Sequence, residues 1–383
     1  MLVSGLPFLL SPWRAQALGP VGRGEISYFQ SGLSIMLAVA AIGARHAYYE
    51  ARAASDLRLR VTVWPMALAS AGVASLVAVP LLLIAVDRMS LIVIVGIVVA
   101  WLISPLQVLT QMEVAESQAS LRRPRILALT GLPSFVEAMG TLLFLILQKL
   151  TIATSVIVTL IAELTRVVAS RAFRRRDRLR VGGESLAAPV NLLARGAVLA
   201  PVSLLPLLVS NVDSIVLAPF VPIATLGLYA VSKLAFGLLL LTAGTVEGMV
   251  IRGERRNRNL VVAVVCLAAV AVVVAAAGYL FTPLLFGSEF EDARLGFLTS
   301  SLGGWLGGVG ALLSTLIVWG GRARVVLISS VVAAGTTVVG ALLLGLLVEN
   351  PAVWAMGLPA VAGYGVGAAI LAGALLSRKR RLV

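Results

Sequence analysis

Apolar stretches long enough to cross a membrane recur from one end of this 383-residue chain to the other. A helix needs roughly 20 apolar residues to span a bilayer core of about 30 Å. Hydrophobic residues make up 60% of the chain and charged residues only 13%, whereas about a quarter of the residues in a soluble domain are charged. The sequence therefore excludes a water-soluble fold and predicts an all-α integral membrane protein.

The apolar stretches predict about twelve transmembrane helices. We expect them at residues 2–18, 25–45, 61–86, 90–112, 126–148, 151–170, 192–218, 224–250, 259–282, 295–319, 324–348 and 353–377. The first is short, contains two prolines and has no basic residues before it. The longest predicted loops, 171–189 and 283–294, are too small for an extramembrane catalytic domain, which argues against an enzyme that works from a large loop.

Basic residues gather in alternate connections, and this pattern predicts the orientation of the chain. Only Arg23, Arg88, Lys149 and Arg294 fall on one side. The other side receives 22 basic residues, in the groups Arg52, Arg58, Arg60; Arg122, Arg123, Arg125; Arg171, Arg174, Arg175, Arg176, Arg178, Arg180; Arg252, Arg255, Arg256, Arg258; Arg322, Arg324; and Arg378, Lys379, Arg380, Arg381. Because basic loops stay in the cytoplasm, we expect a multi-pass protein of the cell membrane with both termini cytoplasmic. The net charge of +14 then reflects membrane topology, and no nucleic-acid partner is expected.

An internal repeat divides the chain into two similar halves. A shift of 199 positions sets LPFLLSPWRAQALGP, which starts at Leu6, over LPLLVSNVDSIVLAP, which starts at Leu205, with six of fifteen positions identical. After a four-residue insertion, Gly24 aligns with Gly227 and Gln30 with Lys233. We therefore predict two six-helix lobes, residues 1–180 and 181–383. An even number of helices per lobe makes them parallel repeats, with a binding site expected where they meet.

Charged residues inside the predicted spans are candidate site residues, because each costs roughly 2.5–3.5 kcal/mol at a helix centre. The candidates are Arg14, Glu137, Glu163, Arg166, Asp213, Lys233 and Glu247. Glu163 and Arg166 are three positions apart, so an intrahelical pair is the simpler interpretation. Glu247 is close to a basic cluster and is interpreted as interfacial.

Two of these charges occupy equivalent positions of the repeat. Arg14 aligns with Asp213, so the two side chains either face each other across a cavity or act separately, Arg14 reaching the interface and Asp213 capping a bend. Lys233 either pairs with Asp213 or is available to a phosphate group.

Residues for metal or redox chemistry are scarce in this sequence. Cys266 is the single cysteine and His46 the single histidine, so the chain alone offers no disulfide, no zinc site and no cysteine pair. An Asp-rich motif is also missing. We therefore expect no metal, no cofactor and no enzymatic activity.

Three segments carry a resemblance to a known family: LGPVGRGEISYFQS from Leu18, NVDSIVLAPFVPIATLGLYAVSK from Asn211 and PLLFGSEFEDA from Pro283. The chain resembles the polysaccharide exporters of the MOP superfamily, the Wzx-type flippases of O-antigen and related lipid-linked oligosaccharides. The short first span departs from that family.

The resemblance implies a transporter that moves a polyprenyl-diphosphate oligosaccharide across the cytoplasmic membrane for surface polysaccharide and lipopolysaccharide biosynthesis. Arg14, Lys233 and Arg166 would then bind the diphosphate and sugar, since an anion needs compensation in a low dielectric. Asp213, Glu137 and Glu163 would bind a coupling ion or balance the charge of the cavity. Membrane lipid, a polysaccharide polymerase and glycosyltransferases would be its partners.

Two other functions stay open from the sequence. A multidrug exporter of the same superfamily would expel an organic cation in exchange for a proton or sodium ion, and it would need an acidic cavity. A membrane scaffold would need no cavity at all. The mixture of buried cations and acids favours an anionic substrate.

Overall fold

The computed structural model describes residues 2–41, 63–119, 122–178, 208–252, 256–319 and 322–380. Most of these residues are helical, and there is no strand among them. Eight helices in this part of the chain are long and apolar enough to cross a membrane: Ala69–Arg88, Pro124–Ile146, Ile152–Phe173, Ile223–Val246, Arg258–Phe286, Ser288–Ile317, Arg324–Leu347 and Val353–Ser377. The stretches Leu91–Leu106 and Leu208–Leu217 are shorter apolar helices. Ten of the twelve predicted spans thus have an apolar helix within them, while the count of twelve itself stays a prediction.

The outward-facing side chains of these helices are apolar, as a lipid environment requires. Along α12 (Arg256–Phe286), Val265, Val272 and Leu284 expose 61, 68 and 76% of their surface. A water-soluble protein rarely exposes such a continuous apolar face. The exposed side chains therefore agree with the multi-pass membrane protein that composition predicts.

The chain forms two compact units, and each is described by itself. Unit 1 comprises residues 1–10 and 29–207, and unit 2 comprises residues 11–28 and 208–383. The predicted boundary between residues 180 and 181 lies outside the described residues.

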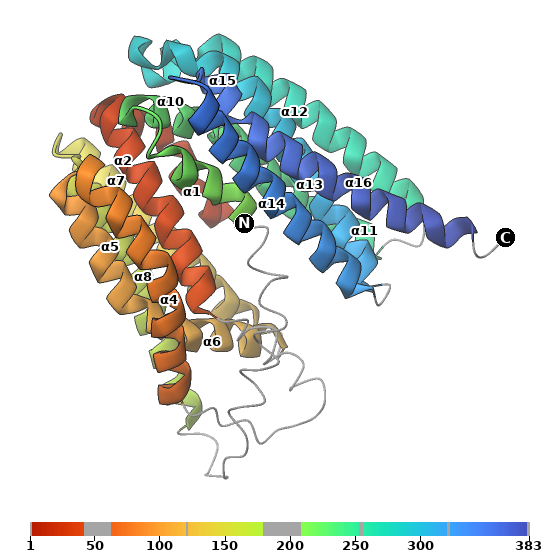
Figure 1. The fold of residues 1–383 in the computed structure, drawn as a ribbon. Helices are drawn as coiled ribbons and strands as arrows, with labels where there is room; N and C mark the ends of the chain where they lie inside the picture. Colours follow the sequence, from red (N-terminus) through yellow and green to blue (C-terminus); the bar gives the residue numbers. More distant parts are fainter. Residues whose placement is uncertain are drawn as a thin grey trace. The chain divides into compact units, whose positions relative to one another are not determined.

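Unit 1 is a helical bundle in which α7 packs against α8 and α1, and α5 against α4 and α8 (Figure 1). Its elements are α1 (Leu2–Leu9), the second part of α2 (Ser11–Ala40), α4 (Val63–Arg88), α5 (Leu91–Ile103), the 3-10 turn η1 (Ser104–Leu106), α6 (Gln107–Ala119), α7 (Arg123–Ile146) and α8 (Ile152–Arg178).

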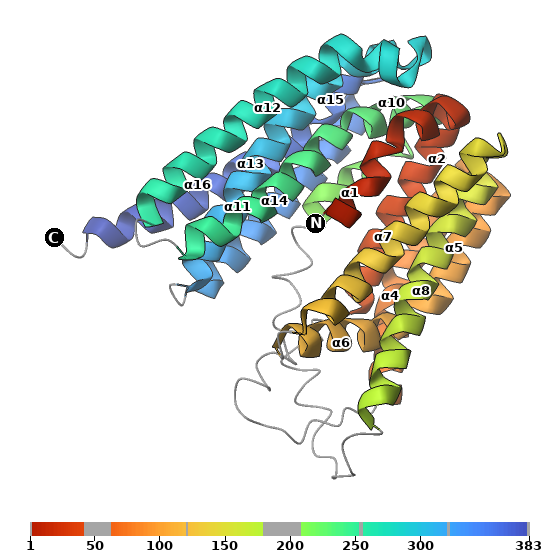
Figure 2. The ribbon, with the colours of Figure 1, turned by 180° about the vertical axis from the view of Figure 1, so that it is seen from behind.

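Unit 2 is a second bundle, centred on α13, which packs against α11, α12 and α16 (Figure 2). Besides the first part of α2 it holds Leu208–Leu217, α10 (Ile223–Ser232), α11 (Leu234–Arg252), α12, the 3-10 segment η2 (Ser288–Ala293), α13 (Arg294–Trp319), α14 (Ala323–Leu347), α15 (Val353–Met356) and α16 (Leu358–Arg380).

The chain reverses direction at Gly19, inside the element assigned as α2. Gly19 has φ 64° and ψ 175°, a conformation that glycine adopts without steric cost. The Arg23 guanidinium donates a hydrogen bond of 3.2 Å to the Ser11 hydroxyl. In one straight helix two residues twelve positions apart would lie about 18 Å apart along the axis, so the stretches 11–18 and 20–40 are separate helices. Arg23, which we expected in an exposed loop, is buried against the first of them.

The first of these helices packs into the core of unit 2. Ala15 is fully buried in a cluster with Val231, Ala235, Phe286, Phe290, Ala293 and Phe297. The Gln16 amide also donates a hydrogen bond of 2.8 Å to the Leu285 carbonyl. The prediction of a loop over residues 283–294 is therefore wrong. α12 continues to Phe286 and η2 follows it, because Phe286 and Phe290 pack into this cluster.

Two glycines that the sequence repeat aligns contact each other within unit 2. A Cβ atom added to Gly227 would overlap the Pro20 carbonyl and lie 2.9 Å from the Gly24 nitrogen, and one added to Gly24 would overlap the Ile223 carbonyl. The backbones of α2 and α10 thus cross in direct contact. Small residues are what such a close crossing between membrane helices requires.

Local structure also recurs at about the spacing of the sequence repeat. The Arg122 amide bonds to the Ser117 carbonyl at 2.8 Å, and the Arg322 amide, 200 positions later, bonds to the Ile317 carbonyl at 3.1 Å. These turns precede α7 and α14, and each of these helices is followed by a non-glycine residue with positive φ, Gln148 at 53° and Asn350 at 51°.

Candidate functional site

The strongest cluster of polar side chains in unit 2 surrounds Asp213, in the middle of the helix Leu208–Leu217. Its carboxylate is fully buried. One oxygen, Oδ1, accepts hydrogen bonds from the Ser214 amide at 2.7 Å and from the Lys233 ammonium at 2.5 Å. The other, Oδ2, accepts one from the Tyr229 hydroxyl at 2.5 Å. We call Asp213, Ser214, Tyr229 and Lys233 the Asp213 cluster.

Lys233 reaches Asp213 from the junction of α10 and α11. Its ammonium also donates to the Ser214 hydroxyl at 3.0 Å and lies 5.5 Å from the centre of the Tyr229 ring. Tyr229 precedes Lys233 by four residues, one helical turn, so both side chains come from the same face. The lysine side chain is 16% exposed, which makes it the accessible partner of a buried acid.

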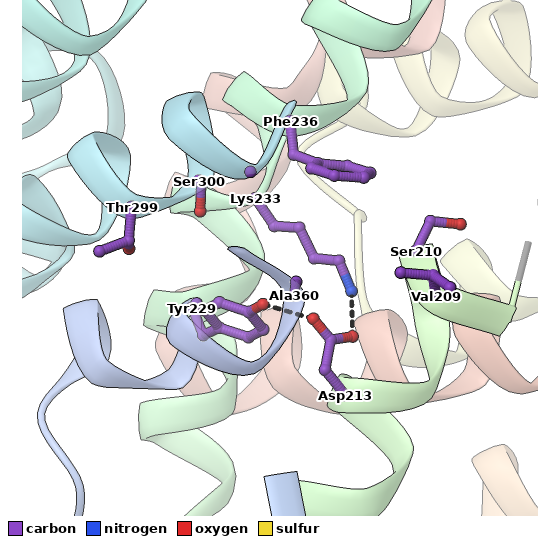
Figure 3. A pocket seen from close by; sticks show the side chains of 11 residues that line it. Val209, Ser210, Asp213, Tyr229, Lys233, Phe236, Thr299, Ser300 and Ala360 are labelled. Atoms are coloured by element: carbon purple, nitrogen blue, oxygen red, sulfur yellow. Dashed lines mark hydrogen bonds and ion pairs between the residues drawn. The ribbon is translucent and has the colours of Figure 1, made fainter. Parts of the chain in front are cut away.

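A small pocket of mixed polar and apolar lining opens beside this ion pair (Figure 3). Tyr229 and Lys233 approach Asp213 from different sides in Figure 3. Only about 10 Å³ is open to the centre of a water molecule, which is room for about one water. The pocket is lined by Val209, Ser210, Asp213, Tyr229, Lys233, Phe236, Thr299, Ser300, Gly303, Gly357 and Ala360. In this structure it is too small for a sugar or an organic cation.

α16 lines the pocket with Ala360, and its Tyr364 lies close to the same cluster. A side-chain hydrogen bond joins Tyr364 to Ser210, and Tyr364 lies close enough to Asp213 for their charges to interact. Its ring packs on Phe236 with a centroid distance of 5.3 Å. Tyrosine hydroxyls and serines therefore surround the acid, and Lys233 supplies the positive charge.

Unit 1 has a second polar cluster, partly buried, around Glu163 on α8. The Arg166 guanidinium donates to Glu163 at 2.7 Å, and the Gln107 amide of α6 donates to the same oxygen at 3.2 Å. Glu137 of α7 lies close enough for its charge to interact with that of Glu163. The Gln30 amide of α2 donates to Glu137 at 3.1 Å. We call Gln30, Gln107, Glu137, Glu163 and Arg166 the Glu163 cluster.

The structure brings together two of the charge pairs that the sequence suggested. Lys233 contacts Asp213, and Arg166 contacts Glu163. Arg14 is buried in unit 2 beside Ala15, but it does not line the pocket at Asp213. The side chain of Glu247 is outside the described residues. The repeat relates Gln30 to Lys233, and each of these side chains donates a hydrogen bond to a carboxylate.

Several partners of these charges were not predicted. Tyr229 and Ser214 could have been found from helical spacing, since each lies within one turn of a charged residue of the Asp213 cluster. Tyr364 and Gln107 could not, because they come from helices that are distant in the sequence. Within the described residues, no three His, Cys, Asp or Glu side chains form a group that could hold a metal ion.

No family model and no curated protein sequence matches the chain. Solved structures do match it. An inward-facing multidrug resistance MATE family transporter of the MOP superfamily has a TM-score of 0.67 and 14% identity, covering 98% of this chain and 94% of that chain. An outward-facing one has a TM-score of 0.52 and 16% identity, covering 99% and 93%.

A flippase is also among the similar structures. Lipid II flippase MurJ in an inward closed conformation has a TM-score of 0.66 and 10% identity, covering 98% of this chain and 87% of that chain. These neighbours are transporters and flippases and not enzymes. At such low identity the likeness concerns the fold, and the chain therefore has the fold that MATE transporters and the MurJ flippase share.

Proposed function

We propose that the chain is a Wzx-type flippase, which moves a polyprenyl-diphosphate-linked oligosaccharide across the cytoplasmic membrane for surface polysaccharide synthesis. In this proposal it has twelve spans in two six-helix lobes, divided near residue 180, with both termini in the cytoplasm. The fold supports transport, and the buried charges support the choice of an anionic substrate.

The observation that carries the proposal is the ammonium of Lys233 at the pocket of unit 2. Asp213 pairs with this ammonium in the structure, and an ammonium released from that pair among hydroxyl groups would attract a phosphate and repel an organic cation, both effects being strengthened by the low dielectric. Ser210, Thr299 and Ser300 line the same pocket and offer hydroxyl donors to phosphate or sugar oxygens. Arg14 and Arg166 are the other cations that we propose for the substrate.

The acidic residues would serve the energy coupling of the cycle. Glu137 and Glu163 lie near each other in unit 1, and Arg166 pairs with Glu163, so the Glu163 cluster can take up a proton or a small cation when the local charge changes. Asp213 balances Lys233 while no substrate is bound.

Binding by the purified protein in detergent tests the proposal. A polyprenyl diphosphate at 100 times its dissociation constant should stabilise the protein by about 2.7 kcal/mol, and a matched polyprenol without phosphate should not. Lys233→Ala should lose this stabilisation, while Arg294→Ala, at an exposed ion pair, should keep it. Equal stabilisation by polyprenol and its diphosphate would contradict an anion site.

A second candidate function is the export of organic cations, and the Glu163 cluster favours it. Two carboxylates lie near each other there and one of them pairs with an arginine, and MATE transporters of similar fold are named as multidrug resistance proteins. In the same binding assay an organic-cation dye would then stabilise the protein, and Glu163→Gln would abolish that effect.

The proposed orientation can be tested by thiol labelling. In a Cys266→Ala background, a cysteine replacing the exposed Ser288 should react with an impermeant reagent in cells whose outer wall is opened. A cysteine replacing the exposed Arg324, at the start of α14, should react only in inverted vesicles. The reversed pattern would contradict cytoplasmic termini.

A further inference from the structure

We infer that Asp213 competes with the substrate's phosphate for Lys233, and that anion binding is therefore coupled to the uptake of one proton by Asp213. The inference rests on the proposed function, because it takes the anion site at Lys233 as given. The resemblance implies only that Asp213 binds a coupling ion or balances charge; the competition between Asp213 and the phosphate for Lys233 is new.

The competition follows from the geometry of the Asp213 cluster. The Lys233 ammonium already donates to Asp213 Oδ1 at 2.5 Å and to the Ser214 hydroxyl at 3.0 Å. An ammonium has three donors, and these contacts take two of them. Only the third donor is left for a phosphate. Because the carboxylate and the phosphate are both anions and repel each other around one ammonium in a low dielectric, a close ion pair with the phosphate draws Lys233 away from Asp213.

Once Lys233 has turned to the phosphate, the Asp213 carboxylate cannot reach solvent. Asp213 is fully buried in the middle of a helix and is held by the Ser214 amide and the Tyr229 hydroxyl. A buried carboxylate that loses its cation is strongly unfavourable unless it is neutralised. The ionisable groups that face it are Lys233, Tyr229 at the α10–α11 junction and Tyr364 from α16. Once Lys233 has left, neither tyrosine supplies a positive charge.

A proton fits this position better than a metal ion. A metal ion would need several ligands, and within the described residues no three His, Cys, Asp or Glu side chains form a group that could supply them, whereas a proton needs only one carboxylate oxygen. The Ser214 hydroxyl lies 3.4 Å from Asp213 Oδ1 and can accept the new carboxyl hydrogen, while Tyr229 continues to donate to Oδ2.

The exchange balances in atoms and charge. The paired ammonium and carboxylate, an anionic phosphate oxygen and one proton become an ammonium–phosphate pair and a neutral carboxyl group. No bond other than the O–H bond of Asp213 forms, and no oxidant or reductant is needed. Release of the phosphate reverses each step, returns Lys233 to Asp213 and releases the proton.

Isothermal calorimetry of the full-length protein in detergent, with geranylgeranyl diphosphate as the probe, tests this inference. Buffers of different ionisation enthalpy should reveal one more proton taken up by the wild type than by Asp213→Asn. When the pH falls by one unit, the affinity of the wild type for the probe should rise by up to tenfold more than the affinity of Asp213→Asn does. The diphosphate itself titrates in both experiments, so its contribution cancels when the values for the two proteins are subtracted.

The variant should also bind the probe more tightly than the wild type at neutral pH, by tenfold or more, because the internal competitor is gone. Equal affinity and equal proton uptake in the two proteins would overturn the competition while leaving the anion site intact. Dependence of the affinity on sodium in place of pH would overturn the proton as the coupled cation. If neither protein binds the diphosphate but a dye binds, the proposed function itself fails.

Discussion

Gly227→Ala is expected to destabilise unit 2 by about 3 kcal/mol or more, because the added methyl group overlaps the Pro20 carbonyl where α10 crosses α2. Backbone cannot move aside as a flexible side chain can, so the two helices must separate. The unfolding midpoint of the purified protein in detergent measures the effect.

Gly244→Ala on α11 is the matched control for this change. A Cβ atom at Gly244 meets nothing within 4 Å, and alanine favours a helix over glycine by about 1 kcal/mol. The control should therefore leave the midpoint unchanged or raise it. If both variants unfold at the wild-type temperature, the direct contact between the glycines of the two repeats is wrong.

Breaking the ion pair of the Asp213 cluster is expected to have the second large effect on stability. Lys233→Met leaves a buried carboxylate without its cation, which costs about 3–5 kcal/mol. The double variant Lys233→Met with Asp213→Asn removes both charges and should recover much of that loss. A double-mutant cycle on the free energy of unfolding should then give a coupling energy of about 1–3 kcal/mol.

The exposed pair of Arg294 and Glu291 is the control for the cycle. Its side chains are 34% and 59% exposed, at an N–O distance of 3.0 Å. Exposed pairs of this kind contribute about 0–1 kcal/mol. A coupling energy at Lys233 and Asp213 no larger than that of the control would show that the buried pair is not what holds the cluster together.

The helices of this protein were predictable because lipid makes hydropathy a strong signal. Long spans such as α12 and α14 follow from uninterrupted apolar residues. The reversal at Gly19 also separates the first two predicted spans. The packing of residues 11–28 into unit 2 was not predictable, because it depends on where Ala15 meets Phe286 and Phe290, which are about 270 positions away in the sequence.

The candidate site was predictable in part for a similar reason. Charges inside apolar spans are rare enough to be noticed, and the spacing of Glu163 and Arg166 indicates their pair. For Lys233 the sequence left two alternatives, Asp213 or a phosphate, and the structure shows the first. Neutral partners such as Gln107 and Tyr364 carry no comparable signal, since an uncharged side chain in an apolar span does not require a partner of opposite charge.

Movement of a fluorescent polyprenyl-diphosphate sugar in liposomes tests the central claim most directly. The label in the inner leaflet should become accessible to an impermeant quencher in vesicles that contain the wild-type protein and stay protected in empty ones. The double variant Lys233→Met with Asp213→Asn, which avoids an unpaired buried charge, should slow this movement at least tenfold, and Glu291→Gln should not. A label that stays protected with the wild-type protein, in vesicles that do expel an organic-cation dye, would contradict the claim and establish multidrug transport.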